Sequence, residues 1–121
     1  GGSRPPRLRP DTSDDDRATG PIPPAAARDA FDEGLAAYLD GDPAVAEAAL
    51  LGALDLDPTF DEARYLLALI HQDAGRLADA LDALDAVLAS HAEDAPRVAL
   101  RGEARRLREL VALRLRRAGG A

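Results

Sequence analysis

The residues with the widest chemical range in this chain are its two histidines, because the chain contains no cysteine. His71 and His91 fall in different segments, and neither has the spacing that would pair it with a serine nucleophile. Catalysis requires several groups that converge on one reacting atom, and the sequence offers no such set and no glycine-rich phosphate loop. We therefore expect no enzyme, no catalytic residue and no cofactor. His71 is predicted to be a partly buried structural residue.

Acidic residues are dense between Asp55 and Glu62, as they are in calcium loops. Such a loop needs glycine at its sixth position and a bidentate glutamate at its twelfth. Counted from Asp55, these positions hold Phe60 and Leu66. No metal site is predicted.

Charge is divided unevenly along the 121 residues, whose net charge is −7. Residues 1–25 are neutral, residues 26–94 carry three arginines against sixteen acids, and residues 95–121 carry eight arginines against two glutamates. An acidic body thus precedes a basic C-terminal segment. Every basic residue apart from the histidines is arginine, and asparagine is also absent, which indicates GC-rich, bacterial-type coding.

The first 25 residues are rich in proline, arginine and aspartate and contain only two aliphatic residues. Such a segment cannot bury enough apolar surface to offset its ordering entropy, so we predict a disordered tail. The opening Gly1-Gly2-Ser3 suggests a linker in place of the natural start. No stretch reaches the roughly 18 apolar residues of a membrane span, and no signal-peptide core is seen, so a cytoplasmic location is favoured.

From residue 26 onward apolar residues recur at helical spacing, which predicts five helices. Proline, glycine and aspartate punctuate them: Gly41 and Gly75 suit left-handed helix stops, and Asp42-Pro43 suits a helix start. The predicted helices cover residues 26–40, 43–56, 59–74, 77–90 and 95–117. Residues 118–121 are predicted to be disordered.

Small and apolar residues also repeat at an interval of 34 residues. The pairs are Gly41 with Gly75, Ala46 with Ala80 and Leu50 with Leu84, and Gly34 with Ala68 and Gly102. A period of about 34 residues is typical of the tetratricopeptide repeat, and the chain resembles that family over residues 27–94. The resemblance implies an all-α, α-α superhelix: two helix-turn-helix units, which make four helices, plus a long C-terminal helix, residues 95–117, that caps the last unit. The domain is therefore expected to span residues 26–117.

The resemblance further implies a ligand surface on the concave face, formed by the first helix of each unit. The residues mapped to this surface as a peptide-binding site are Phe31, Leu35, Tyr38, Glu62, Tyr65, Leu69, Gln72 and Asp73. Tyr38 and Tyr65 are equally compatible with a core role, and for Phe31 the core role is favoured. An apolar groove with an acidic rim would select a peptide or helix with apolar anchors and basic flanks.

The basic C-terminal helix is a second candidate site. Its arginines on one flank are Arg97, Arg101, Arg105 and Arg108. The favoured interpretation is an amphipathic cap whose Leu107 and Val111 pack near Leu84 and Leu88, with arginines close to Asp82 or Asp85. Contact with nucleic acid or an anionic membrane is a weaker interpretation, because the acidic body would repel phosphate.

The sequence thus predicts a protein–protein interaction module that recruits a peptide or helix to a larger complex. The alternative is a self-associating scaffold, a homodimer in which Leu110, Leu113 and the groove are buried. A basic segment suited to the groove, Arg4 to Pro10, is present in the chain itself, but the aspartates behind it argue against self-docking.

Overall fold

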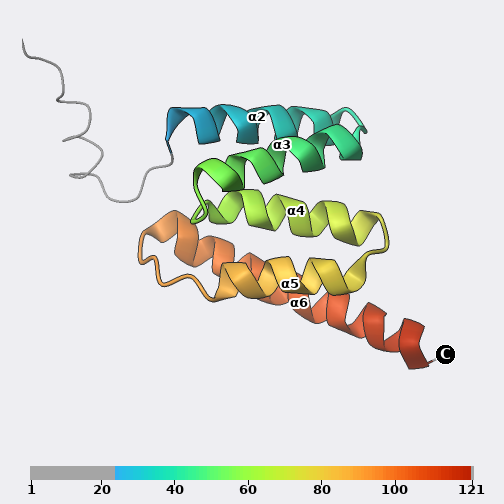
Figure 1. Ribbon diagram of the computed structural model, residues 1–121. Coiled ribbons are helices and arrows are strands. Elements are labelled where there is room, and N and C mark those ends of the chain that lie inside the picture. The colour runs from blue at the N-terminus through green and yellow to red at the C-terminus, as the bar shows by residue number, and fades with distance from the viewer. Residues whose placement is uncertain (1–23, 121) are drawn as a thin grey trace, which may run out of the picture.

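The computed structural model describes residues 24–120. It is all-α, and the described residues form five helices: α2 (Ala25–Leu39), α3 (Pro43–Leu56), α4 (Asp61–Asp73), α5 (Leu77–Leu88) and α6 (Ala95–Gly120). They stack in chain order as antiparallel pairs, with α2, α4 and α6 running in one direction and α3 and α5 in the other (Figure 1). The predicted fold class, two helical hairpins and a long C-terminal helix, is confirmed. The disordered tail was predicted over residues 1–25; residues 1–23 lie outside the described residues, and Ala25 already belongs to α2.

Helices α2 and α4, the first helix of each pair, end with the same backbone geometry. Gly41 and Gly75 have φ values of +83° and +82°, and each amide donates to a carbonyl three residues back. The next amide closes the wider bond of a Schellman motif, Asp42 N to Ala37 O at 2.9 Å and Arg76 N to His71 O at 2.8 Å. Glycine suits this left-handed position because it has no β-carbon. The two stops are therefore equivalent parts of two repeats.

The helix starts differ in detail from the predicted ones. Asp42 caps α3 as expected and accepts from Val45 N. Helix α4 begins at Asp61 rather than residue 59, because the Asp57 carboxylate accepts from the backbone and the hydroxyl of Thr59, at 3.0 and 2.6 Å. These bonds hold the link as a turn.

Two helix ends also differ from the prediction. Helix α5 ends two residues early, at Leu88, and α6 continues three residues past 117. Residues 118–120, predicted to be disordered, are thus helical, since each glycine costs only about 1 kcal/mol in a helix.

The core consists of two apolar clusters, the first formed by residues of α2, α3 and α4 and the second by residues of α4, α5 and α6. The first is centred on Leu50, Phe60 and Ile70, and the second on Leu84, Val87 and Val111. Ala46 and Ala80 are fully buried, as expected of positions where two helices cross closely.

Three positions deviate from the expected pattern. Leu39 and Val45, which the periodicity placed on apolar faces, are 74% and 54% exposed. They lie on either side of the α2–α3 turn. Gly102 does not match Gly34 in packing either, because a β-carbon there would meet nothing within 4 Å. No helix follows α6 in the described chain to cross it at this point.

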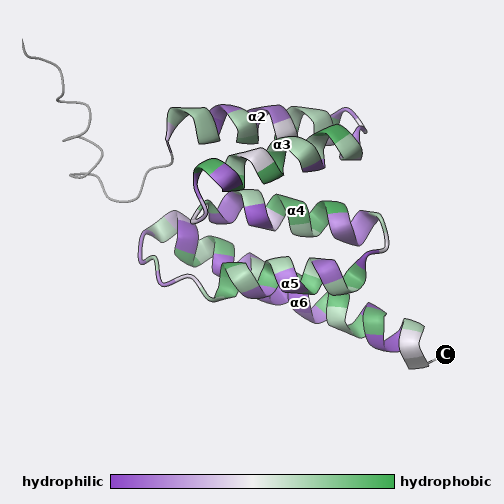
Figure 2. Ribbon diagram, viewed as in Figure 1, coloured by the Kyte–Doolittle hydropathy of each residue, from purple (hydrophilic) through white to green (hydrophobic). Residues whose placement is uncertain are grey.

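Helix α6 covers the second pair as the predicted cap. Ala104 and Val111 are fully buried against α5, and Leu107 is packed in the same cluster. The Arg108 Nε lies 2.6 Å from Asp85 Oδ1, which is one of the expected ion pairs. The C-terminal part of α6 extends beyond α5 and carries apolar residues there (Figure 2). Leu110 is 58% exposed and Leu113 37%.

Candidate functional site

Helices α2, α4 and α6 bring most of the predicted site residues to one side of the molecule. Helix α4 contacts both α2 and α6, whereas α3 and α5 do not contact each other within the described residues. Two polar contacts join α2 to α4: Arg28 Nη1 to Glu62 Oε1 at 3.3 Å, and the Tyr38 hydroxyl to Asp73 Oδ2 at 2.9 Å. We call the surface of these three helices the concave face.

The aromatic residues of the predicted site lie at different depths. Tyr38 and Tyr65 are half-buried, and each packs with part of its ring against a core cluster. Phe31 is 9% exposed, and its ring centroid lies 5.1 Å from that of Phe60. Phe31 therefore belongs to the core, as the favoured interpretation held.

The charges of the concave face act on both tyrosines. Burial, the hydrogen bond that Tyr38 donates to Asp73 and the charge of that carboxylate raise the pKa of Tyr38 above its ordinary value. Burial and the charge of Glu103 raise the pKa of Tyr65, while Arg106 partly opposes them. Since Glu103 and Arg106 belong to α6, the face continues from α4 onto α6.

The other predicted groove residues are accessible to a ligand. Leu35, Leu69 and Gln72 are half-buried, while Glu62 and Asp73 are exposed. On α6, a stripe at steps of three and four residues continues the same side. It consists of Glu103, Arg106, Leu110 and Leu113.

An acidic hollow of about 360 Å³ lies between the start of α4 and the start of α6. Its charged lining consists of Glu62, Asp94 and Glu103 against the single Arg97. The apolar lining comes from Pro96, Ala99 and Leu100. The sequence pointed to Glu62 in this role but missed the part contributed by α6, because which faces of α4 and α6 meet depends on packing.

Arg28 contacts the lining of the hollow, which the sequence did not reveal. Its guanidinium lies 5.3 Å from the centroid of Phe31 and 6.0 Å from that of Phe60, and it also pairs with Glu62. It therefore covers the aromatic pair and orients one acid of the hollow.

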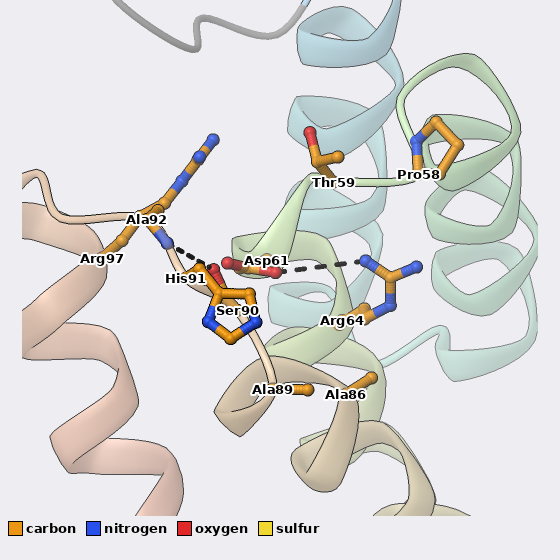
Figure 3. Close-up of a pocket in the computed structure, with 10 residues that line it drawn as sticks. All are labelled: Pro58, Thr59, Asp61, Arg64, Ala86, Ala89, Ser90, His91, Ala92 and Arg97. Carbon is orange, nitrogen blue, oxygen red and sulfur yellow. Dashed lines mark hydrogen bonds and ion pairs between the residues drawn. The ribbon is translucent and has the colours of Figure 1, made fainter.

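A second hollow, of about 500 Å³, lies on the loop side, between the α3–α4 and α5–α6 connections. Its buried Asp61 faces Arg64, with 4.0 Å between the ion-pair atoms (Figure 3). The Ser90 hydroxyl oxygen accepts a bond from Ala92 N at 3.3 Å, and so supports a turn. His91 and Arg97 also line this hollow. These contacts hold the two connections in place. Among the described residues of this hollow, no nucleophile contacts a base.

The predicted basic flank of α6 is divided by the fold. Arg108 binds Asp85, Arg97 lines both hollows, and Arg105 is exposed. Arg101 is half-buried, and its Nη1 has no hydrogen-bond partner among the described residues. The four arginines thus lie in different environments and do not form one continuous basic surface.

His71 is half-buried and accepts a hydrogen bond from Arg76 Nε at 3.0 Å. Arg76 also reaches back to Glu47 of the first pair at 2.9 Å. This matches the structural role predicted for the histidine. Among residues 24–120, no group of histidines and acids has the arrangement of a metal site, and none of the helices is long and apolar enough to span a membrane.

A model of the tetratricopeptide repeat matches residues 37–104, which is more than half of the chain. The chain belongs to the tetratricopeptide repeat family. No curated protein and no solved structure is significantly similar to it. Proteins of this family generally mediate protein–protein interactions or act as scaffolds, and are typically not enzymes.

Proposed function

We propose that the concave face binds a peptide or helix of another protein, with apolar anchors and basic flanks, and recruits it to a larger complex. The observation that carries this proposal is the acidic hollow. Its lining combines three carboxylates and one guanidinium with the apolar residues Pro96, Ala99 and Leu100. Charge complementarity would select a basic partner and speed its association.

The apolar contacts would come from side chains of α2 and α4 on the concave face. Tyr38, Tyr65 and Leu69 present partly buried side chains, which can contact a ligand without large rearrangement. Tyrosines of this kind provide contact area at low entropy cost, as in interface hot spots. The hydrogen bond between Tyr38 and Asp73 fixes the position of one ring.

A titration with two synthetic peptides tests the proposal. In the first peptide leucines alternate with arginines, and in the second glutamates replace the arginines. We expect binding of the first only, with an affinity that falls as salt rises. Equal binding of both peptides would contradict charge selection.

Variants locate the site. The double variant Glu62→Gln, Glu103→Gln should weaken binding, because it removes two carboxylates of the hollow. The control is the double variant Asp55→Asn, Asp82→Asn, which removes the same charge from exposed positions outside the hollow and should leave binding nearly unchanged. Tyr38→Ala with Tyr65→Ala should cost about 2 kcal/mol or more of binding free energy if the rings are anchors.

The exposed leucines of α6 favour self-association as a second candidate function. Leu110 and Leu113 are 58% and 37% exposed, although Val111 between them is fully buried. The molecular mass in solution over a range of concentrations tests this candidate. A mass that stays that of one chain at high concentration would exclude it, while the double variant Leu110→Ser with Leu113→Ser should abolish a dimer.

A further inference from the structure

We propose that the acidic hollow is occupied by the arginine-rich segment of this chain's own N-terminal region, residues 4–10, which thereby competes with other proteins for the groove. This inference depends on the proposed function, because it assigns an internal competitor to the same surface. The occupant is chosen by three features: its chemistry, the place where it is attached and the charge of the linker.

The chemistry of the segment complements that of the hollow. Residues 4–10 read Arg-Pro-Pro-Arg-Leu-Arg-Pro, with three arginines around one leucine. The lining of the hollow has three carboxylates against Arg97, together with Pro96, Ala99 and Leu100, and Arg28 pairs with one of the carboxylates, Glu62. Arginine can bind a carboxylate through two parallel hydrogen bonds, and the leucine is the one aliphatic side chain available for the apolar lining.

The point of attachment lies beside the hollow. Arg28, in the first turn of α2, contacts Glu62 of the hollow at 3.3 Å. The helix begins at Ala25, and three residues of helix rise only about 5 Å. Residues 11–23 link the segment to this point, and an extended chain of that length covers roughly 40 Å. The segment can therefore reach the hollow with slack.

Attachment compensates for the weakness of exposed ion pairs. Such pairs contribute little individually, but attachment through the short link of residues 11–23 gives the segment an effective concentration on the order of millimolar. Proline also limits the backbone freedom that the segment loses on docking. A weak contact in free solution thus becomes a populated one within a single chain.

The aspartates of the linker determine which part docks. Asp11 and the run from Asp14 to Asp16 carry the same sign as the hollow and are repelled by it. The arginine segment lies farther along the chain, so the linker can arch away from the acidic face while the segment binds. The acidic run thus weighs against docking of residues 11–16 and restricts the contact to the arginine segment, residues 4–10.

The test compares the full chain with two triple variants. Arg4→Ala, Arg7→Ala and Arg9→Ala together neutralise the segment. Arg114→Ala, Arg116→Ala and Arg117→Ala remove the same charge from the exposed end of α6 and serve as the control. Thermal unfolding of both variants confirms that the folded body is retained. The readouts are the backbone amide shifts of labelled protein and the affinity for a synthetic peptide with the sequence of residues 4–10.

We expect the segment variant, and not the control, to shift the amides of Glu62, Ala99, Leu100 and Glu103 relative to the unmodified chain. The free peptide should bind the segment variant about threefold more tightly than the unmodified chain, because an occupied site lowers apparent affinity by its free fraction. Amide shifts that change on dilution would place the segment on a second copy and overturn the intramolecular contact.

The outcomes separate this inference from the proposed function. Equal affinity of the unmodified chain and the segment variant for the peptide overturns self-docking and leaves the groove as a binding site for basic peptides. Absence of binding to either protein overturns both.

Discussion

Gly34 of α2 lies in direct contact with Leu50 of α3, so that a β-carbon on Gly34 would be 2.8 Å from Leu50 Cγ and 3.2 Å from the Ala46 carbonyl oxygen. The two helices of the first repeat therefore cross at a point that admits no side chain. We expect Gly34→Ala to lower the free energy of unfolding by roughly 1 to 3 kcal/mol, the usual cost of overpacking. Chemical denaturation measures it.

Gly102→Ala is the matched control, because its β-carbon would meet nothing within 4 Å. In an otherwise equivalent helical position, alanine should stabilise the protein by about 0.5 to 1 kcal/mol. Destabilisation by both substitutions would show that the loss at Gly34 does not come from the contact with Leu50.

Ala46 and Ala80 occupy equivalent crossings in the two repeats, and both are fully buried. We expect Ala46→Leu and Ala80→Leu each to cost roughly 1 to 3 kcal/mol through overpacking. Ala48→Leu and Ala78→Leu, at exposed positions of the same helices, should change stability by less than about 0.5 kcal/mol. Unchanged melting temperatures for the buried pair would count against equivalent crossings.

Helix α6 is held mainly by apolar packing, since Val111 is fully buried while Arg108 and Asp85 are both largely exposed. Val111→Asp should lower stability by about 3 kcal/mol or more, because it buries an unpaired charge. Arg108→Ala should cost only about 0 to 1 kcal/mol, as exposed ion pairs do. Urea unfolding measures the loss of stability in both variants. A larger loss in Arg108→Ala than in Val111→Asp would show that the ion pair, and not apolar packing, holds α6.

The two tyrosines predict a loss of stability at alkaline pH. The pKa of Tyr38 and that of Tyr65 are raised in the folded protein above the ordinary value of 10.0. The resulting stabilisation is full below the unfolded-state pKa and is lost as pH rises through the folded-state pKa. Between about pH 8 and about pH 11, the free energy of unfolding should fall less steeply in the double variant Tyr38→Phe, Tyr65→Phe than in the unmodified protein. Phenylalanine has no group that ionises in this range. An identical slope in the variant would contradict this.

The repeat could be predicted from sequence because it depends on local chemistry. Gly41 and Gly75 are needed at left-handed helix stops, and small residues such as Ala46 and Ala80 are needed where helices cross. These requirements leave a visible period of 34 residues. The helix starts were less predictable, because the delay of α4 arises from bonds between Asp57 and Thr59 within the turn.

The candidate site was only partly predictable, for physical reasons. Glu62 and Tyr65 follow from the face of one helix, but the hollow also needs Leu100 and Glu103 of α6, whose rotation is fixed by packing on α5. Arg28 was missed because its contacts are with residues more than thirty positions away as well as nearby ones. Long-range side-chain contacts of this type leave no periodic signal.

The amide shift map of the labelled protein, titrated with the leucine–arginine peptide, tests the central claim most directly. The account predicts that the largest shifts fall on the concave face, at Glu62, Tyr65, Leu69, Leu100 and Glu103, and that they diminish as salt is raised. Shifts confined to α3 and α5, or to the loop hollow around Asp61 and His91, would place binding elsewhere and contradict it.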